Sequence, residues 1–171
     1  MEELVLRVPC KEELTYRQKI LADPPTMTYN KAMKDCDGDY NPKTGCIDFH
    51  EGLWDEWYER WVDKVPDRFY AYLYDKTLRR HVGEVALRSV ENPRSYMCSI
   101  VVEDKYRGFG YGRAGLKLLV NHAFEFLDAE ELIDHLPAGR KAAHKLFTTS
   151  GFIIKEVKGE FLVYGLKKSS L

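Results

Sequence analysis

Three glycines at alternate positions, Gly108, Gly110 and Gly112, join an apolar segment to a segment with helical periodicity. The apolar segment, residues 94–104, carries large apolar side chains at both odd and even positions. That pattern is typical of a central strand covered on both faces, because the side chains of a strand alternate between the two faces of its sheet. The chain is therefore predicted to place helices on both sides of a sheet, with the glycine loop leading out of a central strand.

The other periodic segments complete a mixed sheet. Residues 68–75, 80–90 and 94–104 are predicted to form three successive strands of an antiparallel meander. Further strands are predicted over residues 4–9, 129–136, 152–157 and 160–166, and helices over residues 11–23, 52–64, 112–127 and 140–150. Residues 26–50 are expected to be irregular. The 171 residues contain no internal repeat or linker, so the predicted fold is a single α/β domain, residues 1–171, with an α+β mixed sheet.

Composition excludes several classes of function. The net charge of −1 argues against a nucleic-acid partner, which usually requires a basic excess. No apolar run approaches the ~20 residues of a membrane span, and the first residues do not resemble a signal peptide. We therefore expect a cytoplasmic protein with no membrane partner. The four cysteines include no C-x-x-C pair, which predicts reduced thiols and no zinc site.

The spacing of the glycines narrows the kind of ligand. A phosphate-binding P-loop would need Gly-x-x-x-x-Gly-Lys-Ser/Thr, which does not occur. A dinucleotide fingerprint starting at Gly108 would need glycine at position 113, where Arg113 stands, and normally belongs to a βαβ unit. Bare backbone N–H groups that converge at a helix N-terminus instead form a nest for an anionic group such as phosphate. The alternative is a tight strand-to-helix turn without a ligand.

Two motifs resemble those of the GNAT superfamily of acyl-CoA-dependent N-acyltransferases. Residues 107–112, Arg-Gly-Phe-Gly-Tyr-Gly, are similar to its signature Gln/Arg-x-x-Gly-x-Gly/Ala. Its later motif Asn-x-x-Ser/Ala-x-x-Leu-Tyr-x-x-x-Gly-Phe is similar, in register, to Arg140, Ala143, Leu146, Phe147, Gly151 and Phe152. Residues 100–102 resemble the splayed fourth strand of the superfamily. The motifs occur in the expected order, and the resemblance covers roughly residues 68–166.

The resemblance implies a GNAT-type fold with a central, mostly antiparallel sheet and acetyl-CoA as the acyl donor, without a metal. It places the cofactor-binding core at about residues 68–166 and the acceptor side at about residues 11–64. The residues that it implies as cofactor contacts are Ile100, Val101, Val102, Arg107, Gly108, Phe109, Gly110, Tyr111, Gly112, Arg113, Arg140 and Phe147.

Two of these positions depart from the superfamily pattern. Arg140 stands where asparagine is usual, and Phe147 where the superfamily usually has the tyrosine that protonates the departing thiolate. Phenylalanine has no proton to donate. A thiol with a pKa near ~8.5 can leave as a free thiolate, so the loss of this acid need not abolish turnover.

An amine must be neutral to attack a thioester, so a general base is required. Glu84, on a predicted inner strand, is similar to the glutamate of a Gly-Glu pair in several small-molecule members and is the first candidate. Asp134 and His135, beside the expected carboxyl end of a strand that borders the cofactor, are further candidates. The alternative for each of the three is a structural role.

Residues 35–63 hold nine acidic residues against Lys43 and Arg60. In the superfamily this region usually covers the acceptor site, so we expect an acidic roof that concentrates cationic amines, or else a solvated helix face. Residues 37–48 resemble a calcium loop but lack its turn glycine and its bidentate glutamate, which argues against calcium. The tryptophans at 54, 57 and 61 have the spacing of a core stripe, with an aromatic acceptor cage as the alternative.

The sequence is thus interpreted as that of an N-acetyltransferase, a monomer or homodimer, that transfers acetyl from acetyl-CoA to the primary amine of a small cationic molecule. Two alternatives stay open. One is an N-acetyltransferase directed at a protein or peptide. The other is a non-catalytic acyl-CoA-binding regulatory domain, an alternative that stays open because phenylalanine replaces the usual tyrosine at position 147.

Overall fold

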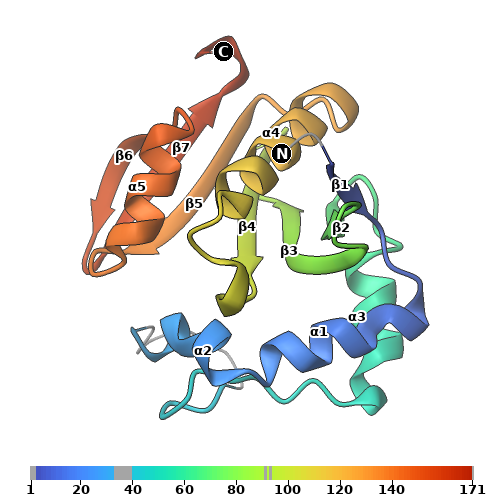
Figure 1. Cartoon of the computed structure of the whole chain (residues 1–171). Helices are drawn as coiled ribbons and strands as arrows, with labels where there is room; N and C mark the ends of the chain where they lie inside the picture. Colours follow the sequence, from blue (N-terminus) through green and yellow to red (C-terminus); the bar gives the residue numbers. More distant parts are fainter. Residues whose placement is uncertain (1–2, 33–39, 91, 93, 171) are drawn as a thin grey trace.

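The computed structural model describes residues 3–32, 40–90, 92 and 94–170, which form one seven-stranded sheet with helices on both faces (Figure 1). The strands are β1 (Leu4–Arg7), β2 (Arg68–Asp75), β3 (Arg80–Ser89), β4 (Ser95–Val102), β5 (Glu131–Pro137), β6 (Ile153–Lys158) and β7 (Phe161–Lys167). The helices are α1 (Leu14–Leu21), α2 (Pro24–Met27), α3 (Trp54–Trp61), α4 (Tyr111–Phe126) and α5 (Lys141–Thr149). Short 3-10 turns are η1 (Lys11–Glu13), η2 (Thr28–Ala32), η3 (Glu51–Leu53), η4 (Asp104–Tyr106) and η5 (Lys168–Ser170).

The strand order is β1-β2-β3-β4-β5-β7-β6, and every neighbouring pair is antiparallel except β4 and β5, which are parallel. The predicted mostly antiparallel mixed sheet is therefore confirmed. At one edge of the sheet, β6 exposes the apolar side chains of Ile153, Ile154 and Val157. That the chain forms a monomer or a homodimer stays a prediction.

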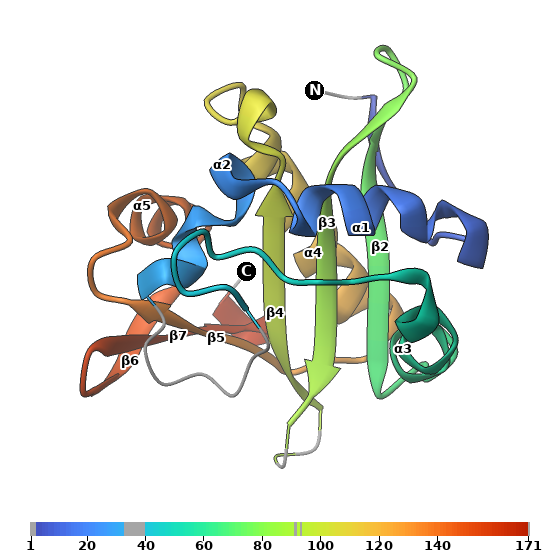
Figure 2. The same ribbon diagram turned by 90° about the horizontal axis from the view of Figure 1, so that it is seen from below.

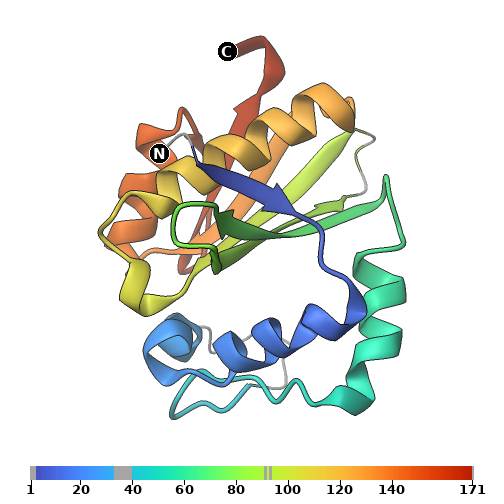
Figure 3. The same cartoon turned by 45° about the vertical axis from the view of Figure 1, so that its right-hand side comes forward.

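Two helical layers cover the sheet. Helices α4 and α5 pack on one face, and α1, α2 and α3 lie on the other (Figures 2 and 3). The main core lies between the sheet and α4, where Leu116, Leu119, Val120 and Ala123 are buried as the periodicity predicts. Strand β4 is central, as predicted, and it buries side chains on both faces, Tyr96 and Cys98 on one and Val101 on the other. Among the described residues, no helix is long and apolar enough to cross a membrane.

Local signals explain two helix ends on opposite sides of the sheet. Helix α1 ends at Leu21, before the double proline at 24 and 25. The chain then continues into α2 and η2, so the start of the segment expected to be irregular is helical. A carboxylate oxygen of Asp23 accepts the Thr26 N–H at 3.1 Å and caps α2, whose first positions tolerate proline because their N–H groups need no helical partner. Helix α5 ends at Thr149, and Gly151, just after its C-cap Ser150, adopts a φ of 91°.

The parallel contact between β4 and β5 is short. The two strands pair only at Ser95–Glu131, Tyr96–Leu132 and Met97–Ile133, although β4 continues to Val102 and β5 to Pro137. Strand β5 stays paired with β7 over its whole length. Beyond Met97 the backbone edge of β4 that faces β5 therefore has no strand partner. Such an edge of backbone N–H and C=O groups requires water or a ligand to satisfy it.

Candidate active site

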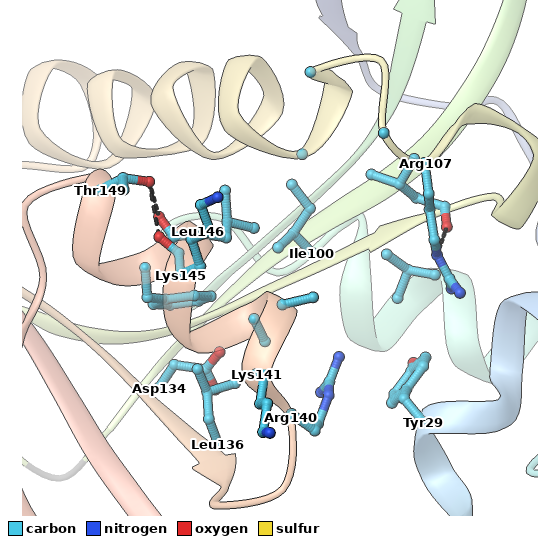
Figure 4. Close-up of a pocket in the computed structure, with 18 of the residues that line it drawn as sticks. Tyr29, Ile100, Arg107, Asp134, Leu136, Arg140, Lys141, Lys145, Leu146 and Thr149 are labelled. Atoms are coloured by element: carbon cyan, nitrogen blue, oxygen red, sulfur yellow. Dashed lines mark hydrogen bonds between the residues drawn. The ribbon is translucent and has the colours of Figure 1, made fainter.

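A cavity of about 730 Å³ opens where β4 and β5 separate (Figure 4). Its walls come from the end of β4, the glycine loop, the end of β5 and α5, with Tyr29 of η2 from the other helical layer. Nine predicted cofactor contacts line it, namely Ile100, Val101, Val102, Arg107, Gly108, Gly110, Gly112, Arg140 and Phe147. The fold thus brings the two sequence motifs together around one cavity, of a size that suits a small-molecule ligand.

The glycine loop exposes backbone to the cavity. Gly108 and Gly110 have φ values of 83° and 86°, and Gly110 is the N-cap of α4. A Cβ atom on Gly108 would have no neighbour within 4 Å, so open space adjoins its backbone, whereas one on Gly112 would lie 3.5 Å from Leu146 of α5. The first N–H groups of a helix have no intrahelical acceptor and lie at its positive end. An anionic group is therefore favoured at this end of the cavity.

Arg107, the first residue of the motif, ties the loop to the opposite helical layer. Its guanidinium donates to the carbonyl oxygens of Thr26 at 2.6 Å and Val102 at 3.1 Å. It also pairs with the carboxylate of Asp104 at 3.1 Å. These bonds occupy most of its donors, so its main visible role is to hold the loop in place.

Three other predicted cofactor contacts, Phe109, Tyr111 and Arg113, are not among the residues that line the cavity. The side chain of Phe109 is 70% exposed. The hydroxyl of Tyr111 donates to Asp75 at 2.7 Å and so fixes the start of α4 to the end of β2. The loop therefore presents its glycine backbone to the cavity more than the side chains between the glycines.

Arg140 and Phe147, the two departures from the superfamily motif, face the same cavity. The guanidinium carbon of Arg140 lies 4.5 Å from the centre of the Tyr29 ring and so joins α5 to η2 across the gap between the strands. Burial lowers the pKa of Arg140 from its ordinary value, although a guanidinium stays charged at neutral pH. The Phe147 ring is buried and packs on Phe152, with ring centres 4.8 Å apart.

Tyr164 is the tyrosine next to Phe147, with ring centres 5.8 Å apart. Its hydroxyl lies 3.0 Å from Nδ1 of His144, while Nε2 of the same histidine lies 3.0 Å from the carbonyl oxygen of Pro137. A carbonyl can only accept, so Nε2 carries the proton and Nδ1 accepts the Tyr164 O–H. Tyr164 is also not among the cavity-lining residues. It therefore does not replace the tyrosine missing at position 147.

Asp134 and His135 lie on β5 but face different surroundings. Asp134 lines the cavity, and burial raises the pKa of its carboxyl to about 7. One of its oxygens accepts the backbone N–H of His135 at 2.7 Å. His135 instead lines a separate hollow with Lys158, and burial lowers the pKa of its imidazole. Of these two candidate bases, the structure places only Asp134 in the cavity.

Glu84 lies in a buried ion pair under α1. Its carboxylate pairs with the guanidinium of Arg17 and accepts the hydroxyl proton of Tyr70. Arg17 itself lies over the ring of Trp57, 4.5 Å from the ring centre, so the pair is enclosed by aromatic side chains. Glu84 is not among the residues that line the cavity. This environment supports the structural alternative for Glu84; its role as a base stays a prediction.

The acidic segment does not form the expected roof over the cavity. Helix α3 lies beside β2, away from β4 and β5 (Figure 2). Its exposed acids Asp55, Glu56 and Glu59 are not among the cavity-lining residues, and Asp55 pairs with Lys11 at 2.8 Å. The expectation of a roof is wrong for α3, because its tryptophan stripe packs on β2 and directs the acids to solvent. Asp35, Asp37 and Asp39 fall outside the described residues, so the first three positions of the calcium-like segment at 37–48 do too.

The tryptophan stripe is part of a core. Trp54 is buried in a cluster with Leu14 and Phe49, and Trp57 packs edge-on against Tyr70 of β2 with ring centres 4.7 Å apart. Trp61 stacks on Trp57 at 6.2 Å. The core interpretation of the helical spacing is therefore confirmed.

The cavity-lining residues that the sequence did not single out include Tyr29, Lys141 and Lys145. The two lysines are four apart on a predicted helix, a spacing that places them on one face and could have indicated a paired cationic site. Tyr29 lies in a segment expected to be irregular, so no periodic signal pointed to it.

Comparisons with known proteins agree with this architecture. The family model described as "Acetyltransferase (GNAT) family" matches residues 30–152. A search of curated proteins gave no match. The spermidine N-acetyltransferase from Vibrio cholerae, solved with CoA and spermine, is similar over 99% of this chain and 98% of that chain, with 15% identity and a TM-score of 0.80. The N-acetyltransferase PseH from Campylobacter jejuni, solved with acetyl coenzyme A, is similar over 68% of this chain and 79% of that chain, with 15% identity and a TM-score of 0.60.

The ion pair of Glu84 makes a prediction about stability. Glu84→Gln removes the only carboxylate that pairs with Arg17 in the described residues and leaves a buried guanidinium without its counter-ion. The free energy of unfolding, measured by urea titration, should fall by about 3 kcal/mol. The control is Glu56→Gln, which removes an exposed pair with Arg60 and should cost at most about 0.5 kcal/mol. Equal stability of the two variants would refute the structural role of Glu84.

Proposed function

Because the chain belongs to the acetyltransferase (GNAT) family, we propose that it transfers an acetyl group from acetyl-CoA to the primary amine of a small cationic molecule. The observation that supports this most directly is the cavity between β4 and β5, which reaches from the glycine loop at the N-terminus of α4 to Tyr29 on the other side of the sheet. An elongated substrate can enter at the loop, and an acceptor can approach from the side of Tyr29.

The cavity fits the chemistry of acetyl-CoA along its length. The pyrophosphate needs several hydrogen-bond donors and a positive potential, which the backbone of Gly108 and Gly110 at the start of α4 can supply. The pantetheine arm carries amide groups, and these can bind the backbone edge of β4 that β5 leaves without a partner. The residues of this chain therefore fit the donor that the family implies.

The cavity also favours a neutral amine at the point of attack. Arg140 is a fixed positive charge at the end near Tyr29, and a nearby like charge lowers the pKa of an ammonium group. A cationic acceptor should therefore react through one amine while a second, distant charge stays outside the cavity. A polyamine of the spermidine class has this form, which agrees with what the Vibrio cholerae neighbour was crystallised with.

Asp134 is the residue best placed to act as general base. It is the only carboxylate among the described residues that line the cavity, and a carboxyl with a pKa of about 7 is well matched to accept a proton at neutral pH. As the amine nitrogen bonds to the thioester carbon, its proton passes to Asp134, and the C–S bond breaks to release the thiolate. Phe147 cannot protonate that sulfur, and the hydroxyl of Tyr164 donates to His144. The remaining proton donors are water and the hydroxyl of Tyr29, which lines the same cavity.

A screen of acceptors tests the activity and separates the alternatives. Purified protein with acetyl-CoA should release CoA in the presence of spermidine or a short diamine, and much less with peptides that offer an N-terminus or a lysine. Acetyl-CoA should also raise the melting temperature, as any ligand of the native state does. A thermal shift without turnover of any acceptor would favour the non-catalytic alternative. Absence of both would refute the proposal.

The role of Asp134 predicts a pH dependence. Because burial raises its pKa to about 7, the basic carboxylate is depleted below that pH, and kcat/KM should rise with pH through this range. Asp134→Asn should lower kcat/KM by about 10²- to 10⁴-fold, the usual worth of a positioned base, and remove this limb of the profile. The matched control is Asp128→Asn, an exposed aspartate that pairs with Arg94 outside the cavity and should leave both quantities unchanged. An unaltered profile in Asp134→Asn would contradict this assignment.

A further inference from the structure

Arg140 is a half-buried cation of the cavity without an anionic partner. Its guanidinium carbon lies 4.5 Å from the centre of the Tyr29 ring, and burial lowers its pKa. Within the parts of the chain that the structure describes, no carboxylate pairs with this guanidinium and no oxygen accepts a hydrogen bond from it. The face of a ring attracts the positive charge, but it leaves the N–H donors in the guanidinium plane without acceptors. A partly desolvated charge of this kind favours the binding of an anion.

Two other arginines that join the helical layer to the rest of the protein do have internal partners. Arg17 pairs with the carboxylate of Glu84. Arg107 pairs with the carboxylate of Asp104 and donates to carbonyl oxygens of α2 and β4. Arg140 differs from both because its donors remain available to a ligand in the cavity.

Arg140 lies at the end of the cavity where the acceptor is proposed to react. In Figure 4 its side chain lies between those of Asp134 and Tyr29. The carboxylate of Asp134 is near enough to raise the pKa of Arg140 against the effect of burial, but the two groups do not form an ion pair. The phosphates of the donor are expected at the glycine loop, and an acetyl group carries no charge. An anion that binds Arg140 must therefore come from the acceptor.

The geometry and charge of the site favour a carboxylate over other anions. A guanidinium presents pairs of parallel N–H groups, which match the two oxygens of a carboxylate. A molecule with two amines and one carboxylate remains cationic, as the proposed acceptor is, whereas a phosphate dianion would cancel both ammonium charges. A diamino acid thus has the anion that Arg140 lacks as well as the overall charge that is proposed.

We propose that Arg140 binds a carboxylate of the acceptor, so that the enzyme prefers a diamino acid to the diamine that lacks the carboxylate. This inference rests on the proposed function and adds to it the chemical class of the acceptor. Pairing with a carboxylate also removes the repulsion that Arg140 exerts on an acceptor with positive charges only.

The test compares acceptors that differ only by the carboxylate, namely ornithine with putrescine and lysine with cadaverine, in an assay of CoA release from acetyl-CoA. Wild-type protein should show a kcat/KM at least about tenfold higher for the diamino acid of each pair, the worth of one charge-assisted contact. Arg140→Asn should remove this preference, mainly by raising KM for the diamino acids, and should not lower kcat/KM for the diamines. Arg140→Lys keeps the charge without the paired donors and should retain only part of the preference.

The chain offers a matched control for this substitution. Arg140 is the N-cap of α5, a position that asparagine favours, so Arg140→Asn should leave the helix intact. Arg79 is exposed in the turn between β2 and β3, with a φ of 53° that asparagine tolerates, and it does not line the cavity. Arg79→Asn removes the same charge and should leave kcat/KM unchanged for both members of each pair.

Each outcome bears on a stated claim. Equal kcat/KM of wild-type protein for both members of each pair would overturn the inference and leave the proposed function intact, and this comparison needs no variant. A preference that persists in folded Arg140→Asn would also overturn it. If succinyl-CoA replaces acetyl-CoA as the better donor to putrescine, and Arg140→Asn reverses this, the carboxylate belongs to the acyl group and the assignment to the acceptor is wrong. If no acceptor releases CoA, the proposed function fails, and the inference with it.

Discussion

The loss of pairing between β4 and β5 is the constraint on which the rest of the structure depends. The strands share three residue pairs and then separate, because β5 stays bound to β7 while β4 stays bound to β3. This separation creates the cavity, leaves one backbone edge of β4 open and lets Tyr29 reach through from the other helical layer. A fully paired sheet would bury the same backbone groups in hydrogen bonds and leave no room for a ligand. The site is thus a consequence of topology first and of side chains second.

The helical layer that contains α1, α2 and η2 must stay fixed to the sheet, because it supplies Tyr29 at one end of the cavity. The buried pair of Arg17 and Glu84, enclosed by aromatic rings, joins α1 to β3. On the side of the cavity, Arg107 and Arg140 join the loop and α5 to α2 and η2. The Arg140–Tyr29 contact spans the gap between β4 and β5, whereas the Arg17–Glu84 pair lies on the face of the sheet that α1 covers. They hold Tyr29 against one end of the cavity while the glycine loop forms the other.

Much of this arrangement could be predicted from the sequence, because it depends on local chemistry. The glycine spacing at 108–112, the two-sided strand at 94–104 and the tryptophan stripe each have one favourable structure, and the fold shows all three. The face that α3 would cover could not be deduced in the same way. The acidic residues of α3 were expected to cover the acceptor site and attract cations, but packing of α3 on β2 directs them away from the cavity. Amphipathic periodicity says which side of a helix is buried and not which strand buries it.

The candidate bases likewise show that local sequence does not reveal which distant residues will surround a side chain. Glu84, Asp134 and His135 are all titratable residues on or beside predicted strands, and the motif resemblance put Glu84 first among them. The tertiary structure distinguishes them. Glu84 is paired with Arg17, His135 lines a different hollow, and Asp134 lies in the cavity with a raised pKa. Only Asp134 combines a place in the cavity with a raised pKa, and its sequence neighbourhood does not indicate either property. Its environment depends on residues far along the chain.

Hydrogen–deuterium exchange with and without saturating acetyl-CoA tests the central claim most directly, namely that the open edge of β4 and the glycine loop bind the donor. Amide exchange should slow in peptides covering residues 98–102 and 107–114. It should stay unchanged over α3, which lies beside β2. Saturable binding of acetyl-CoA with no protection of β4 and the loop, or with protection centred on α3, would contradict a donor site between β4 and β5.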